Sequence, residues 1–408
     1  MADAELLNVL LADGAEPRRI ARLLDTGTGP FLEYDANFLD ERLELSPLTL
    51  PLRPEVYPPG PRYFHRLRGL VADSIPDGFG LKVLHQALRG AGRDPLSVSP
   101  LQLLAAIGDR GMGALLYRPA DDVWGASGDL PSLTQLAAEA ALVEADDVDA
   151  LPDALRRAAG TSAGARPKVT VALDDDGRVR DASQPLGPGF RQVLVKFRGA
   201  TDPKEQVALE AAYLRMASAA GLAVPAAQTL ALDGGEQALV LDRFDRVGDR
   251  RIHVQSLAAL MEIDFRQDLV DYAHLLDALR RVTRDYGEVT RALRLAAFNV
   301  LARNRDDHAK NVSLLMSAEG TWRLAPAYDL TWGGATGYHA MSVAGESRNP
   351  GVADLQRLGR GAGLDAHQVQ AVIAEVQAAI ARWDEFADAA GVPARARRAV
   401  GQSLHVLT

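Results

Sequence analysis

The hydrophobic pattern of this 408-residue chain changes at about residue 250, and this change limits the folds that the chain can adopt. Before that point, short apolar runs rich in β-branched residues alternate with turn-forming residues, which is typical of strands. Beyond Ile252 the sequence is mainly helical, and one apolar stripe at helical spacing follows a capping Asp365. This stripe, which we interpret as core packing, consists of Val369, Val372, Ile373, Val376, Ile380 and Trp383. We therefore predict an α+β protein in which a strand-rich part precedes an all-helical part.

Three domains are predicted along the chain. Residues 1–130 form a domain of short strands followed by compact helices, residues 131–250 a strand-rich lobe with a loop and a hinge, and residues 251–408 the helical lobe. The main predicted strands span residues 6–11, 20–24, 31–34, 168–173, 193–197 and 238–241. A helix is predicted at residues 203–220, with Pro203 in its first turn and Gly221 as its C-terminal cap.

The composition excludes several classes of protein. The chain has no cysteine, so disulfides, thiolate metal sites and a cysteine nucleophile are excluded. No apolar run has the length of a transmembrane helix, and the N-terminal residues do not resemble a secretory signal. A formal net charge of −9 argues against autonomous binding to nucleic acid, because neutralising phosphates needs a basic surface. We therefore expect a cytoplasmic protein without membrane contact, for which a local basic patch or a basic partner is the route to DNA.

Lysine is rare in this chain, since only 5 of the 45 basic residues are lysines. Arginine has replaced lysine wherever a cation alone suffices, so the remaining lysines are enriched at places that need a compact ammonium group. Lys168, Lys196 and Lys310 lie inside the motifs described below, whereas chance survival explains Lys82 and Lys204 equally well.

The segment from residue 298 to residue 311 carries the strongest chemical signal. Apolar residues end abruptly there in a polar run, as expected for a buried helix that leads into an active-site loop. Asp306 and Asn311 have the D-x-x-x-x-N spacing of a kinase catalytic loop, in which the Asp deprotonates the acceptor hydroxyl and the Asn holds a metal ion. Eighteen residues later an apolar strand and turn lead to Asp329, whose carboxylate is placed to be a second Mg²⁺ ligand. The alternative interpretation is a polar turn that caps a helix.

Lys196 follows three apolar residues of a predicted strand, where burial would be costly unless the ammonium group has a partner. In a kinase such a lysine binds the α- and β-phosphates of ATP, and a glutamate on the next helix holds it. Glu210 is the natural candidate for that glutamate, and Glu205 is the less attractive one. The alternative is an exposed lysine on an edge strand.

Two further segments give weaker signals for a nucleotide site. The small residues of the loop at 161–168 offer backbone N–H groups that can approach phosphates, although the loop matches no standard glycine-rich motif. A flexible linker is the alternative. Asp242, Arg243 and Phe244 follow a strand at the expected hinge, where backbone groups could bind adenine while Phe244 packs nearby. A simple strand end is the alternative there.

These motifs, in their order along the chain, resemble the HipA family of kinase toxins from about residue 5 to the C-terminus. The family's D-x-H-x-K-N loop corresponds to residues 306–311, its following aspartate to Asp329, and its Ser/Thr-x-x-Gly-x-x-x-Lys loop to residues 161–168. Further matches are the lysine strand, the following helix, the hinge and four N-terminal signatures, at residues 194–197, 210–225, 241–246, 31–35, 45–47, 73–78 and 107–114.

The resemblance implies the HipA-like kinase fold, with a β-containing N-terminal subdomain, a strand-rich nucleotide lobe and an all-helical C-terminal lobe. It implies that Asp306 is the catalytic base and that Asn311 and Asp329 bind Mg²⁺. It also implies an ATP site made by Ala163, Gly164, Ala165, Arg166, Lys168, Lys196, Asp242, Arg243, Phe244, His308, Lys310 and Tyr328.

Family members are silenced by phosphorylation of a hydroxyl group in the flexible loop, and Thr161 has that position here, with Ser162 adjacent. Three residues depart from the family pattern: Thr161 replaces a common Ser, Arg166 stands where Gln is frequent, and Asp242 replaces a Glu. None of them belongs to the catalytic loop, so the departures bear on regulation more than on phosphotransfer.

The resemblance further implies a small helix-turn-helix antitoxin of the HipB type, through which the chain would reach DNA, and a protein substrate such as an aminoacyl-tRNA synthetase. An ATP- and Mg²⁺-dependent Ser/Thr kinase toxin is therefore the leading hypothesis. The alternative is a nucleotide-binding regulatory protein that acts with a DNA-binding partner and turns over little ATP. A small-molecule phosphotransferase is a third possibility, against which the N-terminal matches argue.

Overall fold

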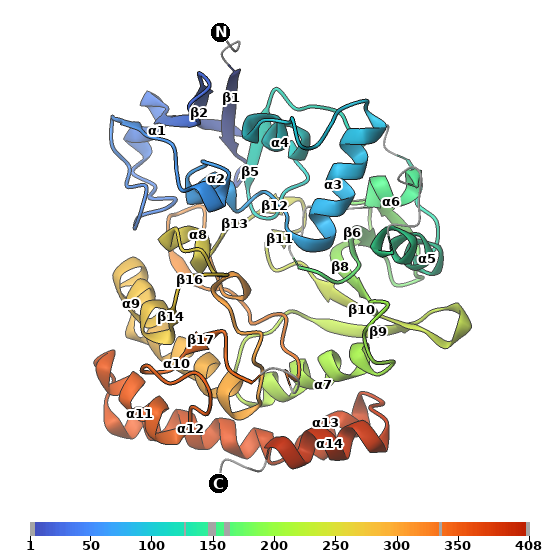
Figure 1. Ribbon diagram of the computed structural model, residues 1–408, viewed down its shortest axis with the longest axis vertical. Coiled ribbons are helices and arrows are strands. Elements are labelled where there is room, and N and C mark those ends of the chain that lie inside the picture. The colour runs from blue at the N-terminus through green and yellow to red at the C-terminus, as the bar shows by residue number, and fades with distance from the viewer. Residues whose placement is uncertain (1–4, 126–127, 146–151, 159–163, 334–336, 405–408) are drawn as a thin grey trace. The chain divides into compact units, whose positions relative to one another are not determined.

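The computed structural model describes residues 5–125, 128–145, 152–158, 164–333 and 337–404, and its elements are labelled in Figure 1. The chain divides into two compact units. The first unit comprises residues 1–202, 228–255 and 316–320, and the second comprises residues 203–227, 256–315 and 321–408. The fold is of the α+β class, as predicted, because sheets and helices both occur and are largely segregated along the chain. The division into three domains stays a prediction.

The first unit contains a five-stranded sheet with the strand order β4-β3-β2-β1-β5. Its strands are β1 (Glu5–Leu11), β2 (Arg18–Asp25), β3 (Pro30–Tyr34), β4 (Val56–Tyr57) and β5 (Leu115–Arg118). Along β1 the side chains of Leu7, Val9 and Leu11 are buried, whereas that of Leu6 is 55% exposed. This alternation fixes the antiparallel register against β2, because a shift by one residue would turn the buried side chains to solvent. The three strands predicted before residue 35 are confirmed.

Helices of the first unit are α1 (Ala36–Glu41), α2 (Gly69–Ala72), α3 (Gly78–Gly90), α4 (Pro100–Ile107), α5 (Leu133–Glu144) and α6 (Asp153–Ala158). A capping box starts α4, in which the Ser99 hydroxyl accepts from the Gln102 backbone and the Gln102 side chain accepts from the Ser99 backbone. Short 3₁₀ turns occur at Arg62–Phe64, Asp233–Gly235 and Ala309–Asn311.

A second five-stranded sheet has the order β7-β6-β8-β10-β9. Its strands are β6 (Lys168–Leu173), β7 (Val179–Asp181), β8 (Arg191–Phe197), β9 (Ala227–Ala231) and β10 (Gln237–Asp242), and β11 (Arg246–Val247), β12 (Arg250–Arg251) and β13 (His253–Ser256) follow. Every residue of β6 is buried, in keeping with its central position and β-branched content. The strands predicted at residues 168–173, 193–197 and 238–241 are therefore confirmed.

A buried ion cluster fixes the chain that follows β10. Asp245 is fully buried, and its carboxylate accepts hydrogen bonds from Arg243 at 2.7 and 2.9 Å, from Arg246 at 2.6 Å and from the Gly113 backbone at 2.7 Å. Burial alone would raise the pKa of Asp245, but the charges of Arg243 and Arg246 outweigh it and hold the pKa well below its ordinary value. Since Arg246 also donates to the Gly111 and Gly113 carbonyls, the cluster joins this chain to the loop before β5.

The second unit is mainly helical. Its helices are α7 (Gln206–Ala219), α8 (Leu257–Met261), α9 (Tyr272–Thr283), α10 (Tyr286–Leu301), α11 (Val352–Gly361), α12 (Ala366–Ile380), α13 (Trp383–Ala389) and α14 (Ala394–Leu404). Short strands join them: β14 (Val270–Asp271) pairs with β17 (Met341–Ser342) in parallel, and β15 (Ser313–Met316) neighbours β16 (Trp322–Leu324). Figure 1 shows the long α10, with α11 and α12 packed beside it.

The ends of the predicted helices are partly confirmed. Asp365 caps α12 through its carboxylate, and Gly221 follows α7 with a φ of 80°, as a left-handed C-terminal residue should. The position of Pro203 was predicted wrongly: α7 begins at Gln206, because a turn in which the Gly199 backbone donates to Asp202 comes first. The predicted stripe also ends early, since α12 stops at Ile380 and Trp383 begins α13, although its side chain is buried.

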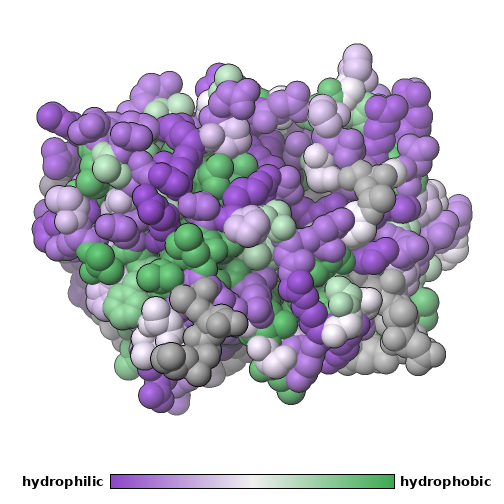
Figure 2. Space-filling view, turned by 90° about the horizontal axis from the view of Figure 1, so that it is seen from above, coloured by the Kyte–Doolittle hydropathy of each residue, from purple (hydrophilic) through white to green (hydrophobic). Residues whose placement is uncertain are grey.

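The face drawn in Figure 2 carries mainly hydrophilic groups, with hydrophobic ones between them. In the first unit, Leu6 on β1 and Leu24 on β2 are paired in register and are 55% and 41% exposed. Within the described residues, no helix combines the length and the apolar character that crossing a membrane requires.

Gly359 is the point at which α11 approaches its neighbours most closely. A Cβ atom at this position would lie 2.6 Å from Val369 on α12 and 3.1 Å from Leu293 on α10. The branched Val369 side chain cannot turn away freely. By contrast, a Cβ atom at Gly361, two residues further along the same helix, would meet no atom within 4 Å.

We therefore expect Gly359→Ala to lower the free energy of unfolding by about 1–2 kcal/mol, because overpacking outweighs the gain in helix propensity. The matched change Gly361→Ala should leave stability unchanged or raise it by a few tenths of a kcal/mol, roughly the propensity gain expected near a helix end. Urea unfolding of both variants measures the difference. Equal stabilities would contradict the close packing of α11.

We also expect Asp245→Asn to lower the free energy of unfolding by about 3–5 kcal/mol, because two buried guanidinium groups lose their counter-charge. Since folding lowers the pKa of Asp245, its contribution is complete above the unfolded pKa of about 3.9 and is lost as the pH falls below it. Asp175→Asn, in a turn where the carboxylate is 97% exposed, is the control and should change stability by less than about 0.5 kcal/mol. Denaturant unfolding at neutral and acidic pH tests both statements, and similar values for the two variants would contradict them.

Candidate active site

The helix α10 ends directly before the predicted catalytic loop. Arg303 has a φ of 52°, a left-handed conformation that stops the helix, and the Asn304 backbone donates to the Asn299 carbonyl at 2.9 Å. The loop that follows places the Asp306 carboxylate in solvent, with 68% of its side chain exposed. The Asn311 side-chain amide donates to the Asp306 carbonyl at 2.8 Å. The two ends of the D-x-x-x-x-N motif are therefore held together.

Asp329 lies on the segment that follows β16. The hydroxyl of the preceding Tyr328 donates to the Lys310 carbonyl at 2.9 Å and lies 2.7 Å from the Ser313 hydroxyl. These contacts join the Asp329 segment to the catalytic loop. Asp329 itself has a φ of 52°, which is rare for a residue with a side chain. Such backbone strain persists where the surroundings fix it and is concentrated at functional sites.

The residues around Asn311 fit a magnesium ion. Because the Asn311 amide nitrogen is used by the Asp306 carbonyl, its side-chain oxygen is the atom left to bind a cation. The Asp329 carboxylate, which is partly exposed, would supply a second oxygen. In the part of the chain that the structure describes, no three His, Cys, Asp or Glu side chains are grouped as for a metal held by protein alone. Mg²⁺ takes one or two carboxylates and completes its shell with water and phosphate, so Asn311 and Asp329 are enough to hold it beside a nucleotide.

The side chain of Phe265 packs beside the catalytic loop. Its ring centroid lies 4.8 Å from that of His308, and the Lys310 ammonium lies 5.8 Å from it. His308 Nε2 is 3.7 Å from the Asp306 carboxylate, whereas its buried Nδ1 has no hydrogen-bond partner within the described residues. His308 thus lies beside Asp306, and the roles of His308 and Lys310 in binding ATP stay predictions. Phe265 was not among the predicted site residues, because no motif marks it.

A buried polar network lies behind the exposed Asp306. The neighbouring Asp307 side chain is fully buried, and it accepts hydrogen bonds from the Tyr272 hydroxyl and from His339 Nδ1, each at 2.9 Å, and from the Ala340 backbone at 2.8 Å. Asn299 donates to the Tyr272 hydroxyl at 2.8 Å. Burial, followed by the charge of Asp307, raises the pKa of Tyr272 well above its ordinary value, so the phenol remains a donor. No sequence motif marks this network, because its members are far apart along the chain.

In the first unit, two lysines concentrate positive charge in the second sheet. Lys168 on β6 and Lys196 on β8 are opposite each other in the antiparallel register, and they are only 5% and 6% exposed. Two like charges placed opposite each other destabilise a sheet unless an anion lies near them. The alternative of an exposed lysine on an edge strand is wrong for Lys196, because Lys196 is buried and β8 is an inner strand. The pairing of Lys196 with Glu210, which is buried on α7 in the second unit, stays a prediction.

The loop before β6 is held by the residues around the start of α3. The Gly164 backbone donates to the Asp77 carboxylate at 2.5 Å, and its carbonyl accepts from the Phe79 backbone at 3.0 Å. A Cβ atom at Gly78 would lie 2.5 Å from the Gly164 oxygen, so only glycine fits this approach. The Lys168 ammonium lies close to Gly164 on the other side. The Lys168 ammonium thus lies beside the Gly164 backbone, and binding of phosphate by this loop stays a prediction.

The other predicted residues of the nucleotide site have assigned contacts or lie outside the described chain. Arg166 forms a 2.7 Å ion pair with Asp202, and Asp242 forms a 2.9 Å ion pair with Arg191. The guanidinium of Arg243 belongs to the Asp245 cluster, and the backbone N–H of Arg243 donates to the Gln192 carbonyl. These contacts of Arg243 are structural. Ala165 and the partly exposed Phe244 lie within the described residues. Thr161, Ser162 and Ala163 lie outside them.

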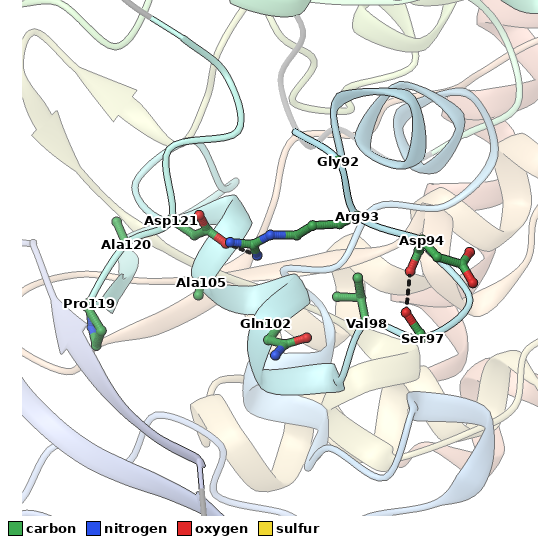
Figure 3. A pocket seen from close by; sticks show the side chains of 10 residues that line it. All are labelled: Gly92, Arg93, Asp94, Ser97, Val98, Gln102, Ala105, Pro119, Ala120 and Asp121. Carbon is green, nitrogen blue, oxygen red and sulfur yellow. Dashed lines mark hydrogen bonds and ion pairs between the residues drawn. The ribbon is translucent and has the colours of Figure 1, made fainter. Parts of the chain in front are cut away.

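A pocket of about 770 Å³ lies elsewhere in the first unit. In Figure 3 the Arg93 side chain reaches across it to Asp121, with which it forms an ion pair, and Asp94 lies beside Ser97. The pocket is also lined by Gln102 and Ala105 of α4 and by residues 119–120. None of the predicted catalytic or ATP-binding residues lines this pocket, so we assign it no part in the chemistry.

Comparisons with known proteins identify the family of this chain. Residues 7–118 match the family model described as the HipA N-terminal domain, and residues 160–383 match the HipA-like C-terminal domain. The chain is 29% identical over 276 residues to a protein of Sinorhizobium fredii named "Putative kinase Y4mE", and 31% identical over 134 residues to Y4dM of the same organism, named likewise. These alignments cover 62% and 30% of this chain, and the chain spans 63% of the length of Y4mE and 32% of that of Y4dM.

Among solved structures, HipA of Shewanella oneidensis MR-1, determined in complex with HipB and operator DNA, has the same fold. Its TM-score is 0.71 at 17% sequence identity, and the match covers 98% of this chain and 94% of that one. The two family models together span most of both compact units, including the catalytic loop and the lysine strands. The chain therefore belongs to the HipA family.

Proposed function

We propose that this protein is an ATP- and Mg²⁺-dependent Ser/Thr protein kinase that acts as the toxin of a toxin–antitoxin module. The observation that carries the proposal is the geometry of the catalytic loop, in which Asn311 is hydrogen-bonded to Asp306 and Tyr328 links the loop to the Asp329 segment. Membership of the HipA family and the kinase names of the two relatives support it.

Different residues of the chain would have different roles in phosphotransfer. The exposed Asp306 carboxylate would orient the acceptor hydroxyl and accept its proton, and its exposure suits an acceptor that is part of another protein. Lys168 and Lys196 would balance the charge of the ATP phosphates from β6 and β8. Asn311 and Asp329 would hold Mg²⁺, which supplies neutralisation of the charge that develops on the phosphoryl group. Phosphoryl transfer needs little else, because positioning and electrostatics account for most of its catalysis.

The proposed partner is a helix-turn-helix antitoxin of the HipB type. Support comes from the Shewanella HipA structure, which contains HipB and operator DNA. The formal net charge of −9 suits a protein that reaches DNA through such a partner. For the phosphorylated protein we propose an aminoacyl-tRNA synthetase, whose modification would arrest growth.

We expect Asp306→Ala and Asp329→Ala each to lower the rate of phosphate transfer at least about 10²-fold, because the first removes the proton acceptor and the second a metal ligand. Asp384→Ala, whose carboxylate is 82% exposed on α13, is the matched control and should retain the wild-type rate. The measurement is incorporation of labelled γ-phosphate into the chain and into a generic Ser/Thr acceptor protein with Mg²⁺. Equal labelling by all four proteins would refute the assignment, and ATP binding without any transfer would favour a regulatory protein.

We expect incubation with Mg²⁺-ATP to add phosphate at Thr161 or Ser162, which would place about two negative charges beside the ATP phosphates and push the loop outward. Intact-mass analysis, followed by peptide mapping, measures the modification. Thr161→Ala and Ser162→Ala variants identify the acceptor. Phosphate found only at other positions would contradict this prediction.

A further inference from the structure

Asp307 is a buried carboxylate next to the residue proposed as the base. Its side chain has no exposed surface, whereas 68% of the adjacent Asp306 side chain is exposed. A carboxylate buried in this way is costly unless its oxygens are hydrogen-bonded. Here Oδ1 accepts from the Ala340 backbone, and Oδ2 accepts from both the Tyr272 hydroxyl and His339 Nδ1. The donors come from the start of α9 and from the segment that follows Asp329.

A second carboxylate holds the same segment, residues 337–345. Asp271, which caps α9, accepts from the Ser342 hydroxyl at 2.7 Å and from the Gly345 backbone at 2.8 Å. The parallel pairing of β14 with β17 joins the same two stretches of chain. Asp271 therefore fixes the far part of the segment to α9, and Asp307 fixes its near part to the catalytic loop.

The catalytic loop meets the chain after Asp329 at further points. The Ala340 backbone also donates to the Arg305 carbonyl at 3.3 Å, and the Gly333 backbone donates to the Arg303 carbonyl at 2.9 Å. A Cβ atom at Gly333 would lie 2.7 Å from the Arg305 nitrogen, so these backbones touch. The residues on both sides of Asp306 are thus held by hydrogen bonds or backbone contact, while its own carboxylate projects into solvent.

We propose that Asp307 and His339 are a positioning pair, which holds residues 337–345 against the catalytic loop and thereby fixes the orientation of Asp306. This inference rests on the kinase function proposed above and deepens it. Neither residue touches the reacting groups; they act through the backbone of the loop. Tyr272 supports the pair from α9, and Asn299 and Asn304 extend the network, since Asn304 donates to Asn299 at 3.0 Å.

The chemistry of the network demands a carboxylate at position 307. The Ala340 backbone and the Tyr272 hydroxyl are donors, and His339 Nδ1 can carry a proton as well, so a carboxylate, which only accepts, satisfies all three. An Asn side chain has one amide nitrogen, and either orientation would bring that nitrogen against a donor, from Ala340 or from Tyr272 and His339. Asp307→Asn must therefore break part of the network while keeping the size of the side chain. At position 339, Asn can place its amide nitrogen where Nδ1 lies, whereas Leu cannot donate at all.

The test compares the kinetics of four variants with the wild-type chain: Asp307→Asn, His339→Leu, His339→Asn and the control His367→Gln, at an exposed histidine of α12. We expect Asp307→Asn and His339→Leu to lower kcat for phosphate transfer by up to about 10²-fold, the effect of misplacing a catalytic group by about 1 Å. The KM for ATP should change less than about twofold, since the lysines proposed to bind phosphate lie on β6 and β8. His339→Asn should recover most of the lost kcat.

Thermal unfolding of each variant separates positioning from misfolding, because rates are compared only between proteins that are folded at the assay temperature. Wild-type kcat in folded His339→Leu would overturn the positioning role and leave the kinase proposal standing. Equal losses of kcat in His339→Leu and His339→Asn would also overturn the positioning role, since they would show that the hydrogen bond from position 339 does not affect the rate. A wild-type chain that binds ATP and transfers no phosphate would refute the kinase proposal and the inference that rests on it.

Discussion

Each compact unit of this protein is organised around a carboxylate that is removed from water. Asp245 in the first unit and Asp307 in the second have no exposed side-chain surface. Such a group can persist in the interior only if donors surround it, and both obtain donors from chain segments that are distant in sequence. Asp245 uses Gly113, which precedes it by 132 residues, and Asp307 uses Ala340, which follows it by 33. Because a buried carboxylate needs these donors, the loops that supply them are held in place more closely than apolar packing alone would hold them.

The two carboxylates solve the burial problem in different ways. Asp245 is neutralised by two arginines, which hold its pKa well below the ordinary value, so it is charged at neutral pH. The hydrogen-bond donors around Asp307 are a phenol, an imidazole and a backbone amide. The contacts of Asp245 add charge neutralisation to hydrogen bonds, whereas oriented hydrogen bonds hold the Asp307 carboxylate. Charge neutralisation suits Asp245, which holds the predicted hinge in place. Oriented hydrogen bonds suit Asp307, which lies next to Asp306.

The sequence predicted those parts of the fold that depend on local periodicity. Strands β1, β6 and β8 follow from alternation and β-branched content, and α12 follows from its stripe and its Asp365 cap. The prediction for Pro203 failed because Asp202 forms a competing turn, which is a contact rather than a propensity. The burial of Lys196 was predictable, since its neighbours are apolar. The structural role of Arg243 was not, because only the fold brings it to a buried Asp245 that also binds Gly113.

The same reasoning explains what the motif could reveal about the site. A spacing of five residues between Asp306 and Asn311 constrains their chemistry, because the residues lie in one short loop whose ends a hydrogen bond can join. The spacing of the motif contains no information about His339 or Phe265. His339 reaches the loop from the chain before β17, and Phe265 reaches it from the chain after α8. Asp329 shows why such supports matter. Its left-handed backbone costs about 1–3 kcal/mol, and it is retained because Tyr328 is bonded to the catalytic loop on one side and Gly333 packs against it on the other. The geometry on which phosphotransfer would depend is therefore a property of the surrounding contacts, while the motif names only the residues that they position.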